Sequence, residues 1–313
     1  MSRSLVVFVL ASAVYTAATP VANSFNLQAY HRAVILGNSV SDTGRVYEAT
    51  GHQIPDPKYF YQGRFTNGPN WVDQLEAKYH IAVNNYAFGG ATSSNNVVPA
   101  ETPLSKNLLI PSTQDQAELF YKPAVDKDGL PTPDTLHFLE VANNNYIYTE
   151  GEQKPVNATL IDAGVRSILG TVDYLHRTLK ATSVLVFGVP ALEVTPHFLG
   201  LPQQFQRETA HITTEHNRLL LAALEAYQKQ YPAVRLFFFD FKQTMERVIK
   251  DRAAYGFTDV TTACYNEKTG AVCTNADAHL FWDHIHPTTK GHAALLQGVV
   301  DSAFAVGGSG KAR

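Results

Sequence analysis

The sequence predicts an α/β protein with three layers, in which helices cover both faces of a mostly parallel central sheet. Two observations lead to this prediction. Short apolar runs recur along the chain, and segments with apolar residues at helical spacing lie between them. Runs that are apolar on both faces are typical of buried parallel strands, and a regular alternation of strands with helices is typical of an α/β/α domain.

Five apolar runs are expected to be buried strands of a parallel sheet. Each is rich in branched or aromatic side chains, which favour an extended backbone. The runs are AVIL from Ala33, IAVNNYAF from Ile81, TLHFLEVA from Thr135, SVLVFGVP from Ser183 and RLFFFDF from Arg235. Because both faces of each run are largely apolar, we expect helices to cover the sheet on both sides.

Three segments show the periodicity of helices. One lies in TNGPNWVDQLEAKY, with Asn67 and Pro69 near its start and Trp71, Leu75 and Tyr79 on one side. Two further segments carry an apolar stripe that predicts a helix packed on a sheet. Their stripes are Ile161, Val165, Ile168, Val172, Leu175 and Leu179, and Ile212, His216, Leu219, Ala223 and Tyr227. The polar stretches 94–111 and 255–284 fit neither pattern, and such long insertions in compact domains are often functional.

The two ends of the chain are expected to lie outside the folded domain. Residues 1–18 combine Arg3, the run LVVFVLASAVYTA and small residues, which is the pattern of a secretory signal peptide. No later segment has the roughly 18 consecutive apolar residues of a membrane-spanning helix. We therefore expect a secreted, soluble monomer with one domain over 19–313 and a flexible tail over about 306–313.

Composition limits the partners and indicates one covalent link. The formal net charge is −3 and 17% of residues are charged, so the chain lacks the basic excess that nucleic-acid binding needs. Cys264 and Cys273 are the two cysteines, and in an exported protein a close pair favours a disulfide over a metal site or two free thiols. Asn157 begins the glycosylation sequon NAT.

Ser39 is the first candidate for chemistry, in the stretch RAVILGNSVSDTG. It follows a predicted parallel strand, and open α/β folds bind their ligands at the carboxyl ends of such strands. A serine in this position can also be a simple turn residue. The segment FWDHIHP supplies partners for a nucleophile, because Asp283 and His286 are close enough for a carboxylate to fix the tautomer of an imidazole.

Two further features bear on the kind of site. The acidic and histidine residues near the C-terminus could be read as metal ligands, but they lack an HExxH helix or another recognisable spacing, so we expect no metal. They are Asp277, His279, Asp283, His284 and His286. The turn FGGAT and the cluster ANNNY follow predicted strands, and they can supply a backbone N–H and a side-chain amide for an oxyanion.

These blocks, in this order, resemble the SGNH or GDSL hydrolase family of serine esterases and lipases, whose fold is flavodoxin-like. GNSVSDTG resembles the family's first block GDSLSDTG, NYAFGGATS its second, VANNNY its GND-containing third and DHIH its fifth, DxxH. GRFTNGPNWVDQL resembles the GRFSNGPVW segment of a secreted subgroup that includes lipases, acyltransferases and acetylesterases. The resemblance extends from about residue 32 to residue 292.

The resemblance implies a mechanism through an acyl-enzyme, without a metal or organic cofactor. Ser39 would attack the ester carbonyl, His286 would take its proton and Asp283 would stabilise the imidazolium. The oxyanion would be bound by two backbone N–H groups and one side-chain amide, those of Ser39, Gly90 and Asn144. Gly89 and Asn143 are the alternatives if the register differs by one residue.

Two positions depart from the family pattern. Asn38 and Asn145 stand where the first and third blocks of the family have aspartate. With amides in place of carboxylates, the histidine loses an attraction for its proton, and we expect it to stay neutral to a lower pH than aspartates would allow. Alternatively, both asparagines only connect loops.

The sequence therefore predicts a secreted carboxylic ester hydrolase. Aromatic residues at 59–65 include Tyr61 and Phe65, which are candidates for substrate contact. Because no long amphipathic lid is evident, we expect short acyl esters, such as acetyl groups on plant polysaccharides. The alternatives are a lipid acyl hydrolase or acyltransferase, and a carbohydrate binder without activity. The complete set of Ser39, Asp283 and His286 favours an enzyme.

Overall fold

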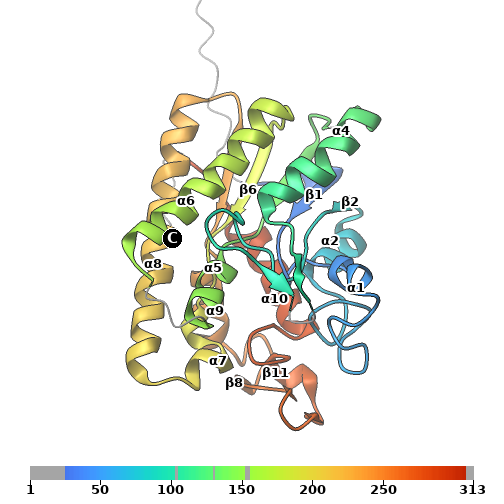
Figure 1. Ribbon diagram of the computed structural model, residues 1–313, viewed down its shortest axis with the longest axis vertical. Helices are drawn as coiled ribbons and strands as arrows, with labels where there is room; N and C mark the ends of the chain where they lie inside the picture. Colours follow the sequence, from blue (N-terminus) through green and yellow to red (C-terminus); the bar gives the residue numbers. More distant parts are fainter. Residues whose placement is uncertain (1–24, 103–104, 130, 152–155, 308–313) are drawn as a thin grey trace, which may run out of the picture.

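A six-stranded sheet lies between two layers of helices in the computed structural model, which describes residues 25–102, 105–129, 131–151 and 156–307 (Figure 1). The strand order is β2-β1-β5-β6-β7-β12. All neighbours are parallel except β12, which is antiparallel to β7. The strands are β1 (Arg32–Leu36), β2 (Ala82–Asn85), β5 (Thr135–Leu139), β6 (Ser183–Phe187), β7 (Arg235–Phe239) and β12 (Phe304–Ala305). The parallel strands thus follow the flavodoxin-like order 2-1-3-4-5, which confirms the predicted fold class.

Alternate side chains of β1 enter two hydrophobic clusters on opposite faces of the sheet. Ala33 and Ile35 belong to one cluster, and Val34 and Leu36 belong to the other. The first face is covered by α2 (Trp71–Tyr79), α9 (Phe241–Lys250) and α10 (Thr289–Ser302). The second face is covered by the π-helical segment η2 (Gln116–Tyr121), α6 (Ala158–Asp173) and α8 (Gln203–Gln230). Figure 1 shows α6 and α8 in front of the sheet and α10 behind it.

Two of the three predicted helices, α2 and α6, begin at residues whose side chains cap them. In α2, Asn70 accepts hydrogen bonds from the backbone of Val72 and Asp73, and the Asp73 carboxylate accepts one from the Asn70 N–H. This reciprocal capping box sets the helix start at Trp71, two residues after Pro69. Asn157 caps α6 by accepting a hydrogen bond from the Leu160 N–H. It is also exposed, so the expected glycosylation site faces solvent and stays a prediction.

The structure corrects one expectation about the strands. The run from Ile81 is not buried on both faces, because β2 pairs only with β1 and its side chains are partly exposed. The ordered chain also extends to the start of the expected tail, since β12 pairs with β7 and the Val306 N–H donates to the carbonyl of Leu236. Residues 308–313 and the expected signal peptide, 1–18, lie outside the described residues.

The two polar stretches contain short elements of their own. The first includes the hairpin β3 (Glu101–Thr102) and β4 (Ser105–Leu109). The second includes β8 (Asp259–Ala263), β9 (Tyr265–Asn266), β10 (Ala271–Val272), η5 (Ala276–Ala278) and β11 (His279–Phe281). The predicted disulfide between Cys264 and Cys273 is confirmed, and it links the two ends of the β9–β10 hairpin. Among the described helices, none combines the length and apolar character needed to span a bilayer.

The remaining short elements connect the layers. They are η1 (Leu27–Ala29), α1 (Arg45–Ala49), α3 (Thr113–Asp115), α4 (Lys122–Asp128), α5 (Asn143–Gly151), η3 (Tyr174–Thr178), η4 (Leu192–Val194) and α7 (Pro196–Leu199). Of these, α5 begins just after β5, and α1 follows the turn after β1. Both therefore lie at the carboxyl edge of the sheet, where a ligand site is expected.

Candidate active site

A cavity of about 310 Å³ opens at this edge of the sheet. The segments after β1, β2, β5 and β6 contribute to its wall, and so do α9 and the segment after β11. Its polar lining includes Ser39, Asn143, Asn144 and His286. Most of the other lining residues are apolar, among them Val46, Ile110, Leu192, Phe241, Met245 and Ile285.

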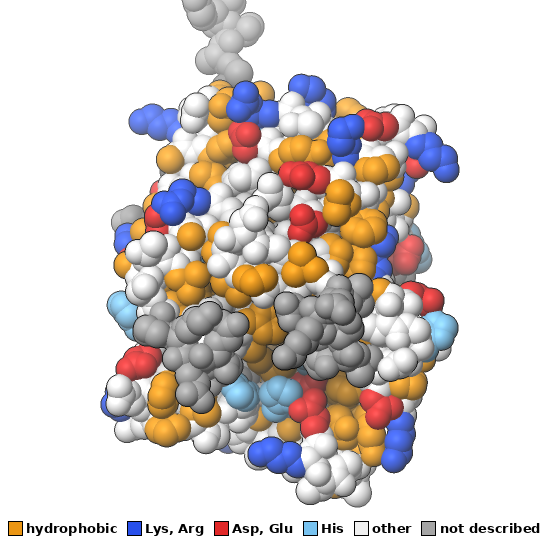
Figure 2. Space-filling view, viewed as in Figure 1, with side chains coloured by type: hydrophobic (Ala, Val, Ile, Leu, Met, Phe, Trp, Pro, Cys, Tyr) orange, Lys and Arg blue, Asp and Glu red, His pale blue; other side chains and the backbone are white. Residues whose placement is uncertain are grey.

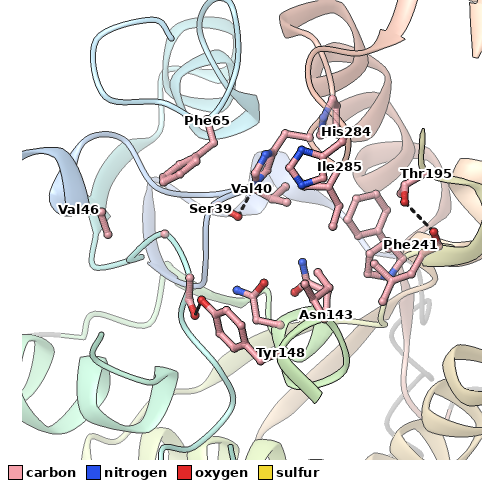
Figure 3. A pocket seen from close by; sticks show the side chains of 18 of the residues that line it. Ser39, Val40, Val46, Phe65, Asn143, Tyr148, Thr195, Phe241, His284 and Ile285 are labelled. Atoms are coloured by element: carbon pink, nitrogen blue, oxygen red, sulfur yellow. Dashed lines mark hydrogen bonds between the residues drawn. The ribbon is translucent and has the colours of Figure 1, made fainter. Parts of the chain in front are cut away.

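Ser39, His286 and Asp283 form a chain of hydrogen bonds in this cavity. The His286 Nε2 atom lies 2.8 Å from the Ser39 Oγ atom, and its Nδ1 atom lies 2.7 Å from Oδ2 of Asp283. Oδ1 of Asp283 accepts hydrogen bonds from the backbone N–H groups of Ile285 and His286, at 2.8 and 2.6 Å. A tight turn therefore fixes the carboxylate and the imidazole together, with Nε2 directed at the serine. Figure 3 marks the hydrogen bond of Ser39 with a dashed line.

The surroundings keep Asp283 ionised. Its side chain is only 2% exposed, and burial by itself would raise the pKa of its carboxyl group. The neighbouring His286, with its charge and hydrogen bond, together with the backbone N–H groups, nevertheless holds the pKa of Asp283 below the ordinary value. An ionised carboxylate at Nδ1 favours the tautomer in which Nε2 can accept a proton from Ser39.

Two backbone N–H groups next to Ser39 are available to a ligand. In the described part of the chain, neither the Ser39 N–H nor the Gly90 N–H is paired with a protein acceptor. Gly90 has φ = +86°, and a Cβ atom there would lie 2.7 Å from the Tyr148 hydroxyl oxygen. That hydroxyl donates to the Gly90 carbonyl at 3.0 Å. Both the positive φ and the close approach require glycine at this position.

Two asparagine side chains face the same cavity. The Asn144 Nδ2 atom donates to the carbonyl of Ala91 at 2.9 Å, and its second hydrogen remains available. The Asn143 Oδ1 atom accepts a hydrogen bond of 2.5 Å from Asn38 Nδ2, which leaves the Asn143 amide nitrogen for the cavity (Figure 3). Both asparagines can therefore offer an N–H group near Ser39. A serine, an imidazole, a carboxylate and a set of free donors are the parts that acyl transfer requires.

Comparison with known proteins agrees with this geometry. The sequence profile of the GDSL-like Lipase/Acylhydrolase family matches residues 34–299. The chain belongs to this family. It is accordingly a hydrolase that acts on ester bonds.

Relatives within the GDSL-like family carry different names. A phosphatidylcholine-sterol acyltransferase from Aeromonas hydrophila is 26% identical, over 86% of this chain and 89% of its own length. The secreted effector protein SseJ from Salmonella typhimurium is also 26% identical, over 83% of this chain but 60% of its own length. An acetylesterase from Thermothelomyces thermophilus is 23% identical, over 86% of this chain and 87% of its own length.

The two positions that depart from the GDSL pattern have different surroundings. Asn145 is fully buried, and its side chain pairs with the backbone N–H and hydroxyl group of Ser93, at 3.0 and 2.8 Å. It does not line the cavity. Asn38 lies directly beneath Ser39 and pairs with Glu140. A buried carboxyl group, that of Glu140 directly after β5, therefore lies beside Asn38. The expected effect of the two asparagines on the pH dependence stays a prediction.

Two acidic residues of this GDSL protein were missed by the sequence analysis. Asp42 accepts hydrogen bonds from the backbone N–H groups of Gly44, Arg45, Val46 and Gly89, and so it ties the turn after β1 to the turn that holds Gly90. Glu140 accepts hydrogen bonds from Asn38 and Ser41. Burial raises the pKa of Glu140 to about 7. Its one sequence signal is a carboxylate at the end of the apolar run TLHFLEVA.

The structure gives the two aromatic candidates for substrate contact different positions relative to the cavity. Phe65 lines the cavity, and its ring centroid lies 5.3 Å from that of His286. Tyr61 does not line the cavity and is 38% exposed. Its backbone pairs with Thr66 across a turn, which carries its side chain towards solvent. Tyr61 therefore lies outside this cavity, and its contact with substrate stays a prediction.

The candidate metal ligands have separate partners. Asp283 and His286 pair with each other, His284 lies 2.6 Å from Glu267, and His279 pairs with the Asn275 carbonyl. The one convergent group in the described residues combines His279 with Cys264 and Cys273. Both sulfur atoms of that group are joined in the disulfide, so they are not the thiolates that bind metal ions.

Proposed function

We propose that Ser39 is the nucleophile of this ester hydrolase and that His286 and Asp283 activate it. Ser39 Oγ attacks the ester carbonyl while its proton moves to His286 Nε2. The imidazolium then returns that proton to the leaving alcohol, which leaves an acyl group on Ser39. Water attacks the acyl-enzyme, again losing its proton to His286, and the carboxylic acid departs as Ser39 regains its hydrogen. The 2.8 Å hydrogen bond between Ser39 and His286 is the observation that supports this proposal.

We further propose that the backbone N–H groups of Ser39 and Gly90 and the Asn144 amide bind the oxyanion. The two N–H groups have no acceptor within the described residues, so a negative oxygen can use them without breaking a bond. Donors of this kind typically contribute about 10²–10³ each to kcat. Asn143 is the alternative amide donor, because its nitrogen also faces the cavity.

The lining of the cavity favours an apolar acyl group. Figure 3 shows Val46 and Phe65 on one side of Ser39 and Phe241 on the other. Val46, Phe65, Ile54, Ile110 and Tyr148 belong to one hydrophobic cluster, and Phe241 and Met245 belong to another. Apolar surface on both sides suits an ester with an acyl chain on one side and an apolar alcohol group on the other. We therefore propose a lipid-type ester in place of the acetylated polysaccharide expected from the sequence.

Short acyl esters remain the second candidate. The observation that favours them is the similarity to an acetylesterase over most of both chains. The similarity to an acyltransferase raises a separate question, whether water or an alcohol takes the acyl group from Ser39. The cavity wall contains few polar groups that could bind several sugar hydroxyls, and this supports the lipid-type ester.

A series of aryl esters from acetate to palmitate tests the proposal. We expect kcat/KM to rise from acetate to a chain of intermediate length, because each added methylene enters an apolar wall. The variant Ser39→Ala is the control for turnover at this site. A maximum at acetate, together with release of acetate from an acetylated polysaccharide, would support the short-chain candidate instead. Parallel assays with a phospholipid, with and without an added alcohol, separate hydrolysis from acyl transfer.

We also propose that the protein is exported as a monomer. Residues 1–18 have the pattern of a signal peptide, and the Cys264–Cys273 disulfide is typical of oxidising compartments. N-terminal sequencing of protein recovered from culture medium should begin near residue 19. Light scattering on the same sample measures its oligomeric state, and its mass after glycosidase treatment shows whether Asn157 carries a glycan.

A further inference from the structure

Glu140 lies directly beneath the turn that carries Ser39. It follows β5, and its backbone N–H donates to the Leu36 carbonyl at the end of β1. Parallel pairing of β1 with β5 therefore brings Glu140 to the level of Asn38. Glu140 is 1% exposed and Asn38 is fully buried. A carboxylate in such a position is costly unless hydrogen bonds satisfy it.

Three donors meet the Glu140 carboxylate. Asn38 Nδ2 donates to Oε1 at 3.1 Å, and the Ser41 hydroxyl and the Asn38 N–H donate to Oε2 at 3.0 and 3.4 Å. The Ser41 oxygen also accepts a hydrogen bond from Trp71 Nε1, so its own hydrogen is free to point at Glu140. An ionised carboxylate accepts from all three partners, whereas a neutral glutamine would turn an NH₂ group against at least one of them.

The same contacts reach both parts of the proposed active site. Asn38 precedes Ser39, and its Oδ1 atom accepts from the Val40 N–H at 3.1 Å. Its Nδ2 atom donates to both Oε1 of Glu140 and the side-chain Oδ1 atom of Asn143. Glu140 thus fixes the orientation of the Asn38 side-chain amide. That amide in turn holds Val40, the residue after Ser39, and Asn143. A shift of Glu140 would displace the nucleophile and the wall of the oxyanion site together.

We propose that Glu140 is a positioning residue that supplies, from the end of β5, the buried carboxyl group that the first block of the GDSL family carries at residue 38. Asn38 and Glu140 would then be an exchanged pair, with the amide on the Ser39 turn and the carboxyl group directly after the neighbouring strand. This inference rests on the proposed role of Ser39 as nucleophile. It differs from a purely structural role because the protonation state of Glu140 should change activity.

The charged groups around Glu140 define what its charge can influence. Burial raises the pKa of Glu140 to about 7, and the charge of His286 acts in the opposite direction by favouring the ionised form of Glu140. Asp42 lies on the same turn, but its carboxylate faces the backbone N–H groups of residues 44–46 and 89. Ser41, Asn38 and Asn143 are neutral. Protonation of Glu140 should therefore contribute to the acidic limb of activity, and Glu140→Gln, which removes this titration, should extend activity to lower pH.

An exchange of the two side chains tests the proposal. The variants are Glu140→Gln, Asn38→Asp and the double variant, with Glu225→Gln on exposed helix α8 as the control for a lost glutamate. Each single variant should lower kcat for an aryl ester about tenfold, the coupling of roughly 1.4 kcal/mol expected for groups in one buried network. The double variant should recover kcat to within about threefold of the wild type, because it restores one amide and one carboxylate.

The pH profile provides a readout that a structural role would not move. The acidic limb of kcat/KM should shift to lower pH in Glu140→Gln and return in the double variant. Equal kcat in Glu140→Gln and wild type, or a double variant no better than the worse single variant, would overturn the inference. If Glu140→Gln does not fold, the comparison of Asn38→Asp with the double variant decides. Turnover retained by Ser39→Ala would instead overturn the proposed function, so the two failures are distinguishable.

Discussion

The Nε2 atom of His286 lies 2.8 Å from the Oγ atom of Ser39, although 247 residues separate them in the chain. Each group is held by its own local turn. Ser39 lies on the turn after β1, and His286 lies on the turn that Asp283 closes after β11. Contact between two independently rigid turns favours a preorganised nucleophile, because little reorganisation is needed when the substrate binds.

Removal of the nucleophile should abolish turnover without unfolding the protein. For Ser39→Ala we expect kcat to fall by several powers of ten, since members of such a triad act as a unit. Thermal melting should change little, because within the described residues the lost hydroxyl bonds only to His286 at the cavity surface. Thr214→Ala, which removes an exposed hydroxyl from α8, is the matched control. A serine-directed phosphonate should label Ser39. If peptide mapping finds the label on a peptide that lacks Ser39, the nucleophile is another residue.

The two asparagines of the oxyanion region should differ in their effects. Asn144→Ala should lower kcat by about 10²–10³ with little change in KM, as expected for a donor that acts mainly in the transition state. Asn143→Ala should have a smaller effect on kcat and should lower the melting temperature, because it breaks the hydrogen bond to Asn38. Steady-state kinetics and melting of both variants make the comparison. The reverse order of kcat losses would assign the amide donor to Asn143.

A larger side chain in the cavity should shorten the preferred acyl chain. Ile110 belongs to the apolar wall and is 3% exposed, so Ile110→Trp should fill part of the acyl space. We expect kcat/KM for long aryl esters to fall at least about tenfold while short esters are affected less, since one or two lost methylene contacts are worth roughly 1–2 kcal/mol. Leu119→Trp, at a position that is 62% exposed, is the control. An unchanged chain-length profile in Ile110→Trp would place the acyl chain elsewhere.

Reduction of the disulfide should weaken the segment that leads to the catalytic turn. The Cys264–Cys273 link closes a loop with a sequence separation of nine, and such a link contributes about 2–3 kcal/mol to the free energy of unfolding by loop-entropy estimates. Reduction, or the double variant Cys264→Ala/Cys273→Ala, should lower both the melting temperature and the activity. Calorimetry and an aryl ester assay measure the two effects. Activity that survives while the melting temperature falls would show that the hairpin does not support His286.

The ion pair between His284 and Glu267 predicts a dependence of stability on pH. The hydrogen bond that the His284 ring donates to the Glu267 carboxylate raises the pKa of His284 above its ordinary value. A raised pKa in the folded state stabilises the protein at pH values below the unfolded pKa, and this stabilisation disappears as pH rises through the folded pKa. The side chains are 47% and 44% exposed, so the effect should be small and weakened by salt.

Figure 2 shows histidine side chains beside an acidic one in the lower half of the face. His284 lines the cavity and pairs with Glu267. The melting temperature of wild type should exceed that of Glu267→Gln at pH 5.5, and the difference should shrink by pH 9. A difference that stays constant across this range, or that grows with pH, would contradict the assigned ion pair. The same scan with His284→Asn is the matched control for the loss of the titrating partner.

The sequence by itself determined the order of strands and helices, because apolar runs and helical periodicity are local patterns. The blocks around Ser39, Gly90, Asn144 and the Asp283–His286 turn could also be recognised in the sequence, since each block is a short segment with its own spacing. The disulfide could be predicted for the same reason. Edge and centre strands could not be told apart, because the neighbours of β2 are set by the sheet and not by its own residues.

Which polar groups contact one another could be seen only in the folded structure. Glu140 and Asn38 are far apart in sequence, and their contact depends on the register between β1 and β5. Tyr61 and Phe65 are close in sequence, yet one turn directs them to solvent and to the cavity respectively. The physical reason is the same in both cases: burial and charge pairing depend on distances between elements, and those distances follow from how the whole sheet and its two helical layers pack together.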